Sequence, residues 1–218
     1  MQAYMKSAMP YLGVALPVTR RITRRAAVDH PPGGLDDLVG SAGELWRAAD
    51  YREERYAATE LTGLKVAAGR LELLPLCREM ITAGAWWDHV DAVSHRVGAM
   101  LKANRPIMLP VIRAWSTDPD RWLRRTSIIC QLDFRNRTDT ALLAEVVAAN
   151  LADPDFFVRK GIGWALRQYA RTDPGWVRLF VDAHAATIST LSRREALKHV
   201  GAAIGPEDVS SIVHGRRP

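Results

Sequence analysis

The sequence predicts an all-α protein whose helices pair and stack into a curved solenoid. Apolar residues recur at intervals of three and four along nearly all of the 218 residues, whereas the alternating pattern of β-strands and the Asn-Gly turns of hairpins are missing. The segments 118–125 and 153–160 are similar in residue type and lie 35 residues apart. Weaker copies of the same pattern lie at 51–55 and 192–196. A period of this length, with one helix pair per unit, is typical of HEAT-like repeats.

The individual helices follow from the same periodicity, with start signals in the second half of the chain. We expect helices at 17–28, 35–49, 51–66, 74–83, 86–102, 106–116, 120–133, 138–151, 154–170, 173–188 and 191–201. Three short connections contain helix-start residues, in which Asp or Thr caps the first turn and Pro fits it: Asp118-Pro119-Asp120, Asp153-Pro154-Asp155 and Thr172-Asp173-Pro174. The Pro- and Gly-rich loop at 30–34 is too short for a linker, so 1–218 is predicted to be a single domain.

Composition favours a folded protein with a basic surface. The chain is 48% hydrophobic and 25% charged, and its 30 Lys and Arg against 24 Asp and Glu give a net charge of +6. Arg heavily outnumbers Lys, and the planar guanidinium binds oxyanions such as phosphate in bidentate fashion. A dense run, Arg20, Arg21, Arg24 and Arg25, is either a solvated helix face or an extension of such a surface.

Several classes of protein are not supported. Cys77 and Cys130 lie in apolar helical patterns without a CxxC pair, so neither a disulfide framework nor a zinc site is expected. The six histidines are scattered, and we assign none of them a catalytic, metal-binding or cofactor-binding role. No apolar run approaches the roughly 18 residues that span a bilayer, and no secretion signal is present, so we expect a cytoplasmic protein without membrane contact.

One candidate site lies in the helix predicted at 86–102. Its apolar stripe, which includes Trp86, Val90 and Val97, is expected to be buried. Trp87 and Asp91 lie one position round from this stripe and four residues apart, so an indole and a carboxylate share one face. The alternative is a Trp at a repeat interface and an Asp bonded to a neighbouring helix.

A second candidate surface is basic and aromatic. Lys160, Trp164, Arg167 and Arg171 form one stripe of the helix predicted at 154–170, apart from its apolar stripe. Cations that neutralise phosphates, with a ring that packs on deoxyribose, suit a DNA backbone. In the preceding unit Arg121 and Arg125 share a face while Trp122 points inward. Salt bridges to acidic residues of neighbouring helices are the alternative for these cations.

Together these segments resemble the DNA alkylation repair glycosylases of the AlkD type, which are built from HEAT-like repeats. The resemblance covers nearly the whole chain, and the order and separation of the matching segments make it specific. They are Tyr4-Met5-Lys6, Leu12-Gly13, Pro17-Val18-Thr19-Arg20-Arg21, Trp86-Trp87-Asp88-His89-Val90-Asp91, Trp122-Leu123-Arg124-Arg125-Thr126 and Lys160-Gly161-Ile162-Gly163-Trp164-Ala165-Leu166-Arg167. The family usually has a further helix before the segment equivalent to Tyr4, so the first repeat is expected to be incomplete.

The resemblance implies an activity and a set of site residues. Trp87 and Asp91 would be the catalytic pair with Arg125 as the third active-site residue, and Trp164 and Tyr4 would contact DNA beside the lesion. Family members excise purines alkylated at N3 or N7 without drawing the base into a pocket, unlike most glycosylases. The implied partner is duplex DNA that contains such purines, bound by a monomer that needs neither metal nor cofactor.

Two other functions remain open at this point. A HEAT-repeat protein that binds DNA without hydrolysis would keep the basic groove, although a carboxylate at position 91 facing phosphates would then be unfavourable. A protein-interaction scaffold would have an apolar groove, or one suited to an acidic partner, and no cluster of Trp with Arg.

Overall fold

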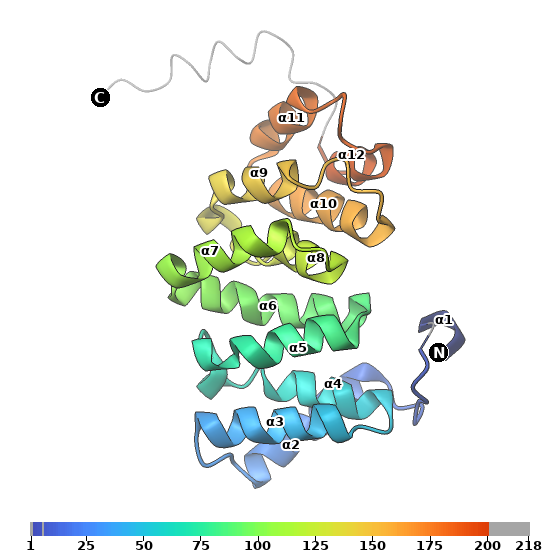
Figure 1. Ribbon diagram of the computed structural model, residues 1–218, viewed down its shortest axis with the longest axis vertical. Coiled ribbons are helices and arrows are strands. Elements are labelled where there is room, and N and C mark those ends of the chain that lie inside the picture. Colours follow the sequence, from blue (N-terminus) through green and yellow to red (C-terminus); the bar gives the residue numbers. More distant parts are fainter. Residues whose placement is uncertain (1, 6, 201–218) are drawn as a thin grey trace.

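The computed structural model describes residues 2–5 and 7–200, and this part of the chain is entirely helical, without a β-strand. The helices stack as a column from α2 and α3 at one end to α11 and α12 at the other, with α1 beside the column (Figure 1). The α-helices are α1 (Gln2–Met5), α2 (Leu16–Asp29), α3 (Leu35–Ala48), α4 (Arg52–Leu61), α5 (Leu74–Gly84), α6 (Trp87–Ala103), α7 (Arg105–Ser116), α8 (Arg121–Ile129), α9 (Thr140–Ala148), α10 (Phe156–Tyr169), α11 (Pro174–Ala183) and α12 (Thr190–Ala196). The predicted all-α, helical-repeat fold is confirmed.

The helices form two layers that alternate along the chain. The even-numbered helices α2, α4, α6, α8, α10 and α12 each contact the next even-numbered helix, and we call them the even layer. The odd-numbered helices from α3 to α11 form the odd layer, in which α3 contacts α5 and α7 contacts α9. Helices of the two layers also pack on each other, as α3 does on α4, α5 on α6 and α7 on α8. Each repeat is therefore one odd and one even helix.

The predicted 35-residue repeat is visible in the starts of α8 and α10. The Asp120 side chain caps α8 by accepting hydrogen bonds from Trp122 and Leu123 N–H, and Asp155 caps α10 in the same way through Phe157 and Val158. Asp118 and Asp153, two residues earlier, each accept a hydrogen bond from the N–H of the capping Asp. The helix starts of these two units are therefore the same local structure, as their sequences predicted.

Some predicted helix ends are wrong because the chain turns earlier than the periodicity indicated. The helix expected at 51–66 ends at Leu61, and two short 3-10 helices follow at Lys65–Ala67 and Leu71–Leu73. Between them Gly69 has a φ of +74°, where a Cβ would lie 2.8 Å from the Ala103 Cβ, so the chain turns tightly there. The helices expected at 120–133, 173–188 and 191–201 end at Ile129, Ala183 and Ala196, and residue 201 lies outside the described residues.

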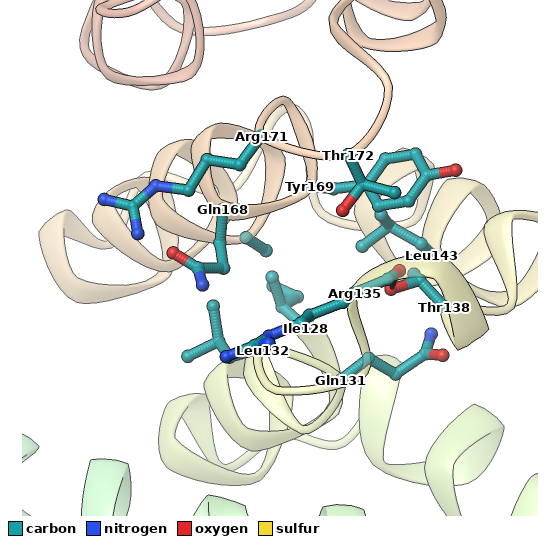
Figure 2. Close-up of a pocket in the computed structure, with 11 residues that line it drawn as sticks. Ile128, Gln131, Leu132, Arg135, Thr138, Leu143, Gln168, Tyr169, Arg171 and Thr172 are labelled. Atoms are coloured by element: carbon teal, nitrogen blue, oxygen red, sulfur yellow. Dashed lines mark hydrogen bonds between the residues drawn. The ribbon is translucent and has the colours of Figure 1, made fainter.

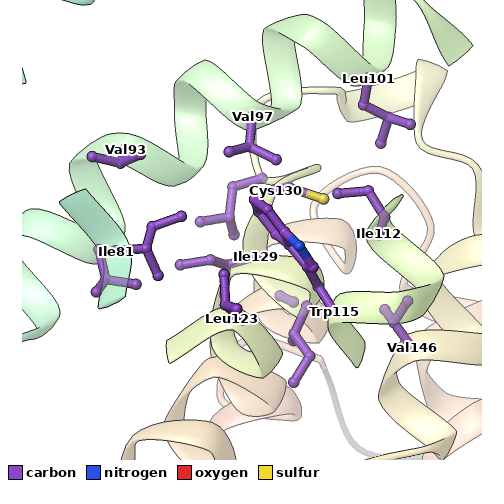
Figure 3. Packing of buried hydrophobic residues seen from close by; sticks show 14 of the residues in the cluster. Ile81, Val93, Val97, Leu101, Ile112, Trp115, Leu123, Ile129, Cys130 and Val146 are labelled. Atoms are coloured by element: carbon purple, nitrogen blue, oxygen red, sulfur yellow. The ribbon is translucent and has the colours of Figure 1, made fainter. Parts of the chain in front are cut away.

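The core runs continuously between the two layers. Side chains such as Ile81, Val97, Ile112 and Ile129 are almost fully buried and pack around Trp115 (Figure 3). Cys130 lies in the same cluster, and both it and Cys77 are free thiols whose pKa values are raised to about 12 by burial. None of the described helices is long and apolar enough to cross a membrane.

Candidate functional site

A cavity of about 640 Å³ brings together four of the residues predicted from the sequence. It is lined by Tyr4 from α1, Trp87 and Asp91 from α6, and Trp164 from α10, although these residues are up to 160 positions apart in the chain. Tyr4 is 76% exposed and lies at the rim. Of these four residues, three contribute aromatic rings and one contributes a carboxylate, and Tyr11, Tyr56, Glu53 and Asp88 line the same cavity.

Asp91 is held by Arg125 of the next even helix. The Arg125 Nε and Nη2 atoms donate to the two Asp91 carboxylate oxygens at 2.7 and 2.8 Å, and Nη1 donates to the Phe157 carbonyl oxygen at 2.5 Å. The side chains of Asp91 and Arg125 are 17% and 6% exposed, and the Arg125 guanidinium lies 5.9 Å from the Trp164 ring centre. The pair has no net charge, but Asp91 remains accessible from the cavity.

The first turn of α6 aims Trp87 into the cavity. Trp86, the residue before the helix, has an extended backbone and packs its half-buried ring against Trp122 and Phe157. Trp122 is buried, as predicted. The next residue, Trp87, is the first of the helix and lines the cavity together with Asp91, four residues later.

Sequence reasoning missed a network of polar side chains in the cavity wall, to which Tyr56 and Asp88 belong. Arg52 at the start of α4 donates to both Asp88 carboxylate oxygens, at 3.1 and 2.6 Å, and the Tyr56 hydroxyl donates to Asp88 at 2.6 Å. The Arg52 and Asp88 side chains are 5% and 8% exposed. Burial alone would raise the pKa of Asp88, but the hydrogen bond from Arg52 and the other nearby positive and donor groups hold it below its usual value.

Glu53, next to Arg52, attaches the N-terminal segment to the repeats. Its carboxylate accepts hydrogen bonds from the N–H groups of Leu12, Gly13 and Val14 at 3.0, 2.9 and 3.1 Å. Residues 11 and 13–16 line the cavity, so this carboxylate fixes one of its walls. In the sequence, Glu53 belongs to the run at 51–55, which we interpret as a weaker copy of the repeat. Its role could not be predicted, because its hydrogen-bond partners lie 39 to 41 residues away in the chain.

His95 is a further cavity residue without an assigned role in the sequence analysis. It lies one turn beyond Asp91 on α6 and lines the same cavity. Its Nδ1 atom is 2.6 Å from the Asp133 carboxylate, which follows α8. The carboxylate thus orients the imidazole ring from outside the cavity.

Most of the predicted DNA-binding cations contact acidic side chains of neighbouring helices. Arg121 lies 3.1 Å from Asp155, and both Lys160 and Arg167 bind Glu195 on α12. The ion-pair alternative thus describes their contacts in this structure. Arg171 has no ion pair among the described residues and lines a second cavity beyond the end of α10. No group of three or more His, Cys, Asp or Glu side chains in the described part of the chain is placed to hold a metal ion.

His89 packs beneath the cavity and gives a testable pH dependence. It is fully buried against the rings of Trp46 and Tyr56, and both ring nitrogens lack a hydrogen-bond partner in the described structure. Burial lowers the pKa of His89 from 6.5 to about 3, although the neighbouring Asp88 charge opposes the shift. Between these two pKa values the unfolded chain binds a proton that the folded protein rejects.

We therefore expect the free energy of unfolding to fall as the pH decreases from about 6.5 towards 3. His89→Phe keeps an aromatic ring in the site and removes the titrating group, so its urea-unfolding free energy should decline less steeply over that interval. An equally steep decline in both proteins would show that His89 does not bind its proton on unfolding.

Comparison with known proteins places this geometry in context. The model of the family described as DNA alkylation repair enzyme matches residues 1–200. A predicted DNA alkylation repair enzyme from Enterococcus faecalis has a similar structure, with 26% identity, a TM-score of 0.79, and coverage of 93% of this chain and 94% of that chain. AlkD2 from Streptococcus mutans shares the fold, with 18% identity, a TM-score of 0.68, and coverage of 92% and 97%. No curated protein matches the sequence.

Proposed function

Because the chain belongs to the DNA alkylation repair enzyme family, we propose that it is a DNA glycosylase that removes purines alkylated at N3 or N7 from duplex DNA. The observation that carries this proposal is the cavity in which the Asp91 carboxylate lies among the rings of Trp87, Trp164 and Tyr4. A carboxylate and aromatic faces both suit a reaction in which positive charge develops.

Removal of an alkylated purine needs few catalytic side chains. Alkylation at N3 or N7 leaves the purine cationic, so it is already a good leaving group and needs little acid catalysis. As the glycosidic bond breaks, its electron pair moves to the purine and positive charge develops on the deoxyribose. Asp91 stabilises this oxocarbenium-like state and orients the water whose oxygen bonds to the sugar carbon, and the water proton passes to solvent.

The neighbouring residues support this reaction in different ways. Trp87 contributes a cation–π interaction of about 0.5 to 2 kcal/mol, and Trp164 and Tyr4 contact the DNA beside the lesion. Arg125 positions Asp91 rather than holding a phosphate, because its Nε and Nη2 atoms bind Asp91 and its Nη1 atom binds the Phe157 carbonyl. Arg121, Lys160 and Arg167 contact DNA by exchanging their carboxylate partners for phosphates.

The test is release of 7-methylguanine and 3-methyladenine from methylated duplex DNA. We expect release of both bases by the purified protein, faster than their spontaneous loss from the same DNA. DNA affinity is measured in parallel at two salt concentrations. No release above the spontaneous rate, with intact folding and DNA binding, would contradict the proposal.

A second candidate function is DNA binding without hydrolysis. We infer it from the Asp91–Arg125 pair: a carboxylate facing phosphates is unfavourable, but a carboxylate neutralised by two hydrogen bonds from a guanidinium repels them little. Salt-sensitive binding with no base release is the result that this function predicts.

A further inference from the structure

A second cavity, of about 260 Å³, opens between the ends of α8 and α10. Its walls come from the last turn of α8, the turn that follows it, the start of α9 and the end of α10. Arg171 and Gln168 extend from the α10 side, and Arg135 extends from the opposite side (Figure 2). Ile128, Leu132 and Ala165 give it an apolar floor.

The guanidinium groups of Arg135 and Arg171 differ from most basic side chains of the even layer in their lack of an acidic partner among the described residues. Arg121, Arg125, Lys160 and Arg167 all bind carboxylates, but the Arg135 and Arg171 side chains have no hydrogen bond or ion pair within residues 2–5 and 7–200. Both arginines are exposed residues that line one cavity. An anion in this cavity would therefore meet two guanidinium groups that are not paired with any described carboxylate.

Two glutamines line this cavity, and they differ in whether their side chains form hydrogen bonds with other described residues. Gln131 connects two segments of the fold, because its amide donates to the Asp139 carbonyl oxygen and its oxygen accepts from the Asp139 N–H, at 3.2 and 2.9 Å. The Gln168 carboxamide makes no hydrogen bond with any described residue and lines the same cavity. It can supply a neutral donor to an anion that the two arginines hold.

The backbone at Arg135 forms a tight turn beside the cavity. Its φ is +53°, in the left-handed region that non-glycine residues enter at a cost of about 1 kcal/mol or more. The Thr138 N–H and hydroxyl both donate to the Arg135 carbonyl oxygen, at 3.1 and 2.7 Å, and hold this turn. The turn thus places Arg135 among the residues that line the cavity.

We propose that this cavity binds a backbone phosphate of DNA, held between the guanidinium groups of Arg135 and Arg171 with the Gln168 amide as an additional donor. Trp164 lies in the second half of α10, and Arg171 follows two residues after the end of this helix at Tyr169. A DNA strand that contacts Trp164 can thus extend along this helix to the cavity. The proposal rests on the DNA-binding part of the proposed function and is independent of base release.

The experiment measures the affinity for an undamaged duplex over a range of salt concentrations, for wild type, Arg135→Ala, Arg171→Ala and the double variant. Each single variant is expected to bind more weakly and to reduce the slope of log K against log salt by about 0.9, the value for one phosphate. The double variant is expected to lose about as much slope as either single variant, because both side chains hold the same phosphate.

The matched control is Arg78→Ala, which removes one positive charge from an exposed arginine on the odd-layer helix α5. Its slope should equal that of the wild type. Slopes of Arg135→Ala and Arg171→Ala that also equal the wild-type slope would overturn the proposal. A loss of about twice 0.9 in the double variant would show two separate phosphates, which would overturn the shared site.

A second measurement separates a DNA phosphate from a free one. Thermal unfolding of wild type and Arg135→Ala is followed with and without inorganic phosphate, against chloride at equal ionic strength. If phosphate stabilises wild type more than Arg135→Ala while the DNA salt slopes of the two proteins agree, the cavity binds free phosphate and the assignment to DNA is wrong. Because the duplex is undamaged, a failure of base release leaves this result intact.

Discussion

Asp91→Asn should reduce the rate of base release by about two to three orders of magnitude while the protein still binds duplex DNA. The size of this effect is that of removing one preorganised electrostatic group from a transition state. Asn keeps the shape of the side chain but removes the negative charge that would stabilise the developing sugar cation. The measurement is single-turnover release of 7-methylguanine from methylated duplex, with DNA affinity determined at the same salt concentration.

The substitution also leaves the Arg125 guanidinium without its carboxylate, so loss of folding must be separated from loss of chemistry. Glu145→Gln is a matched control because it breaks another ion pair between helices, with Arg113 at 2.8 Å, in the odd layer away from the cavity. It should release bases at the wild-type rate. If Asp91→Asn is folded and as active as this control, Asp91 has no part in the chemistry.

Asp88→Ala is expected to lower the free energy of unfolding by about 3 to 5 kcal/mol, measured by urea denaturation at pH 7. The cause is not the lost attraction itself but the Arg52 charge that remains, because its side chain is 5% exposed and keeps little water around it. The Tyr56 hydroxyl loses its acceptor in the same step.

The comparison for this prediction is Glu79→Ala, which breaks the 2.6 Å pair with Arg47 at side chains that are 33% and 60% exposed. Water replaces the lost partner there, so the expected loss is much smaller than that of Asp88→Ala. Arg52→Met combined with Asp88→Leu should recover much of the lost stability, since no buried charge then lacks a partner. Equal losses from Asp88→Ala and Glu79→Ala would refute this account of the network.

The fold could be predicted because its determinants are local. Periodic apolar positions defined the helices, and capping aspartates such as Asp120 and Asp155 marked where two of them begin. Ends were less accurate, because the turns after Leu61 and Ile129 depend on contacts with distant helices. Gly98 is an example: a Cβ there would lie 2.1 Å from the Cys130 carbonyl oxygen, a constraint that the sequence does not display.

Helical spacing alone predicted part of the candidate site, and the family resemblance added Tyr4 and Arg125. Trp87 and Asp91 share a face because they are four residues apart, and both line the cavity. Asp88 and Glu53 were missed because their partners lie on other elements. The cations of α10 shared a stripe as expected, but the acceptor Glu195, which binds Lys160 and Arg167, was not foreseen.

The ion pairs that join successive even-layer helices have a consequence for how such a site arises. Arg52–Asp88, Asp91–Arg125 and Arg121–Asp155 link α4 to α6, α6 to α8, and α8 to the cap of α10. The candidate catalytic carboxylate therefore belongs to a series of ion pairs that recurs between successive even-layer helices. A scaffold of duplicated units can gain a reactive centre without a new arrangement of side chains, because an ion-paired carboxylate that lines a cavity already has the charge and the fixed position that chemistry requires.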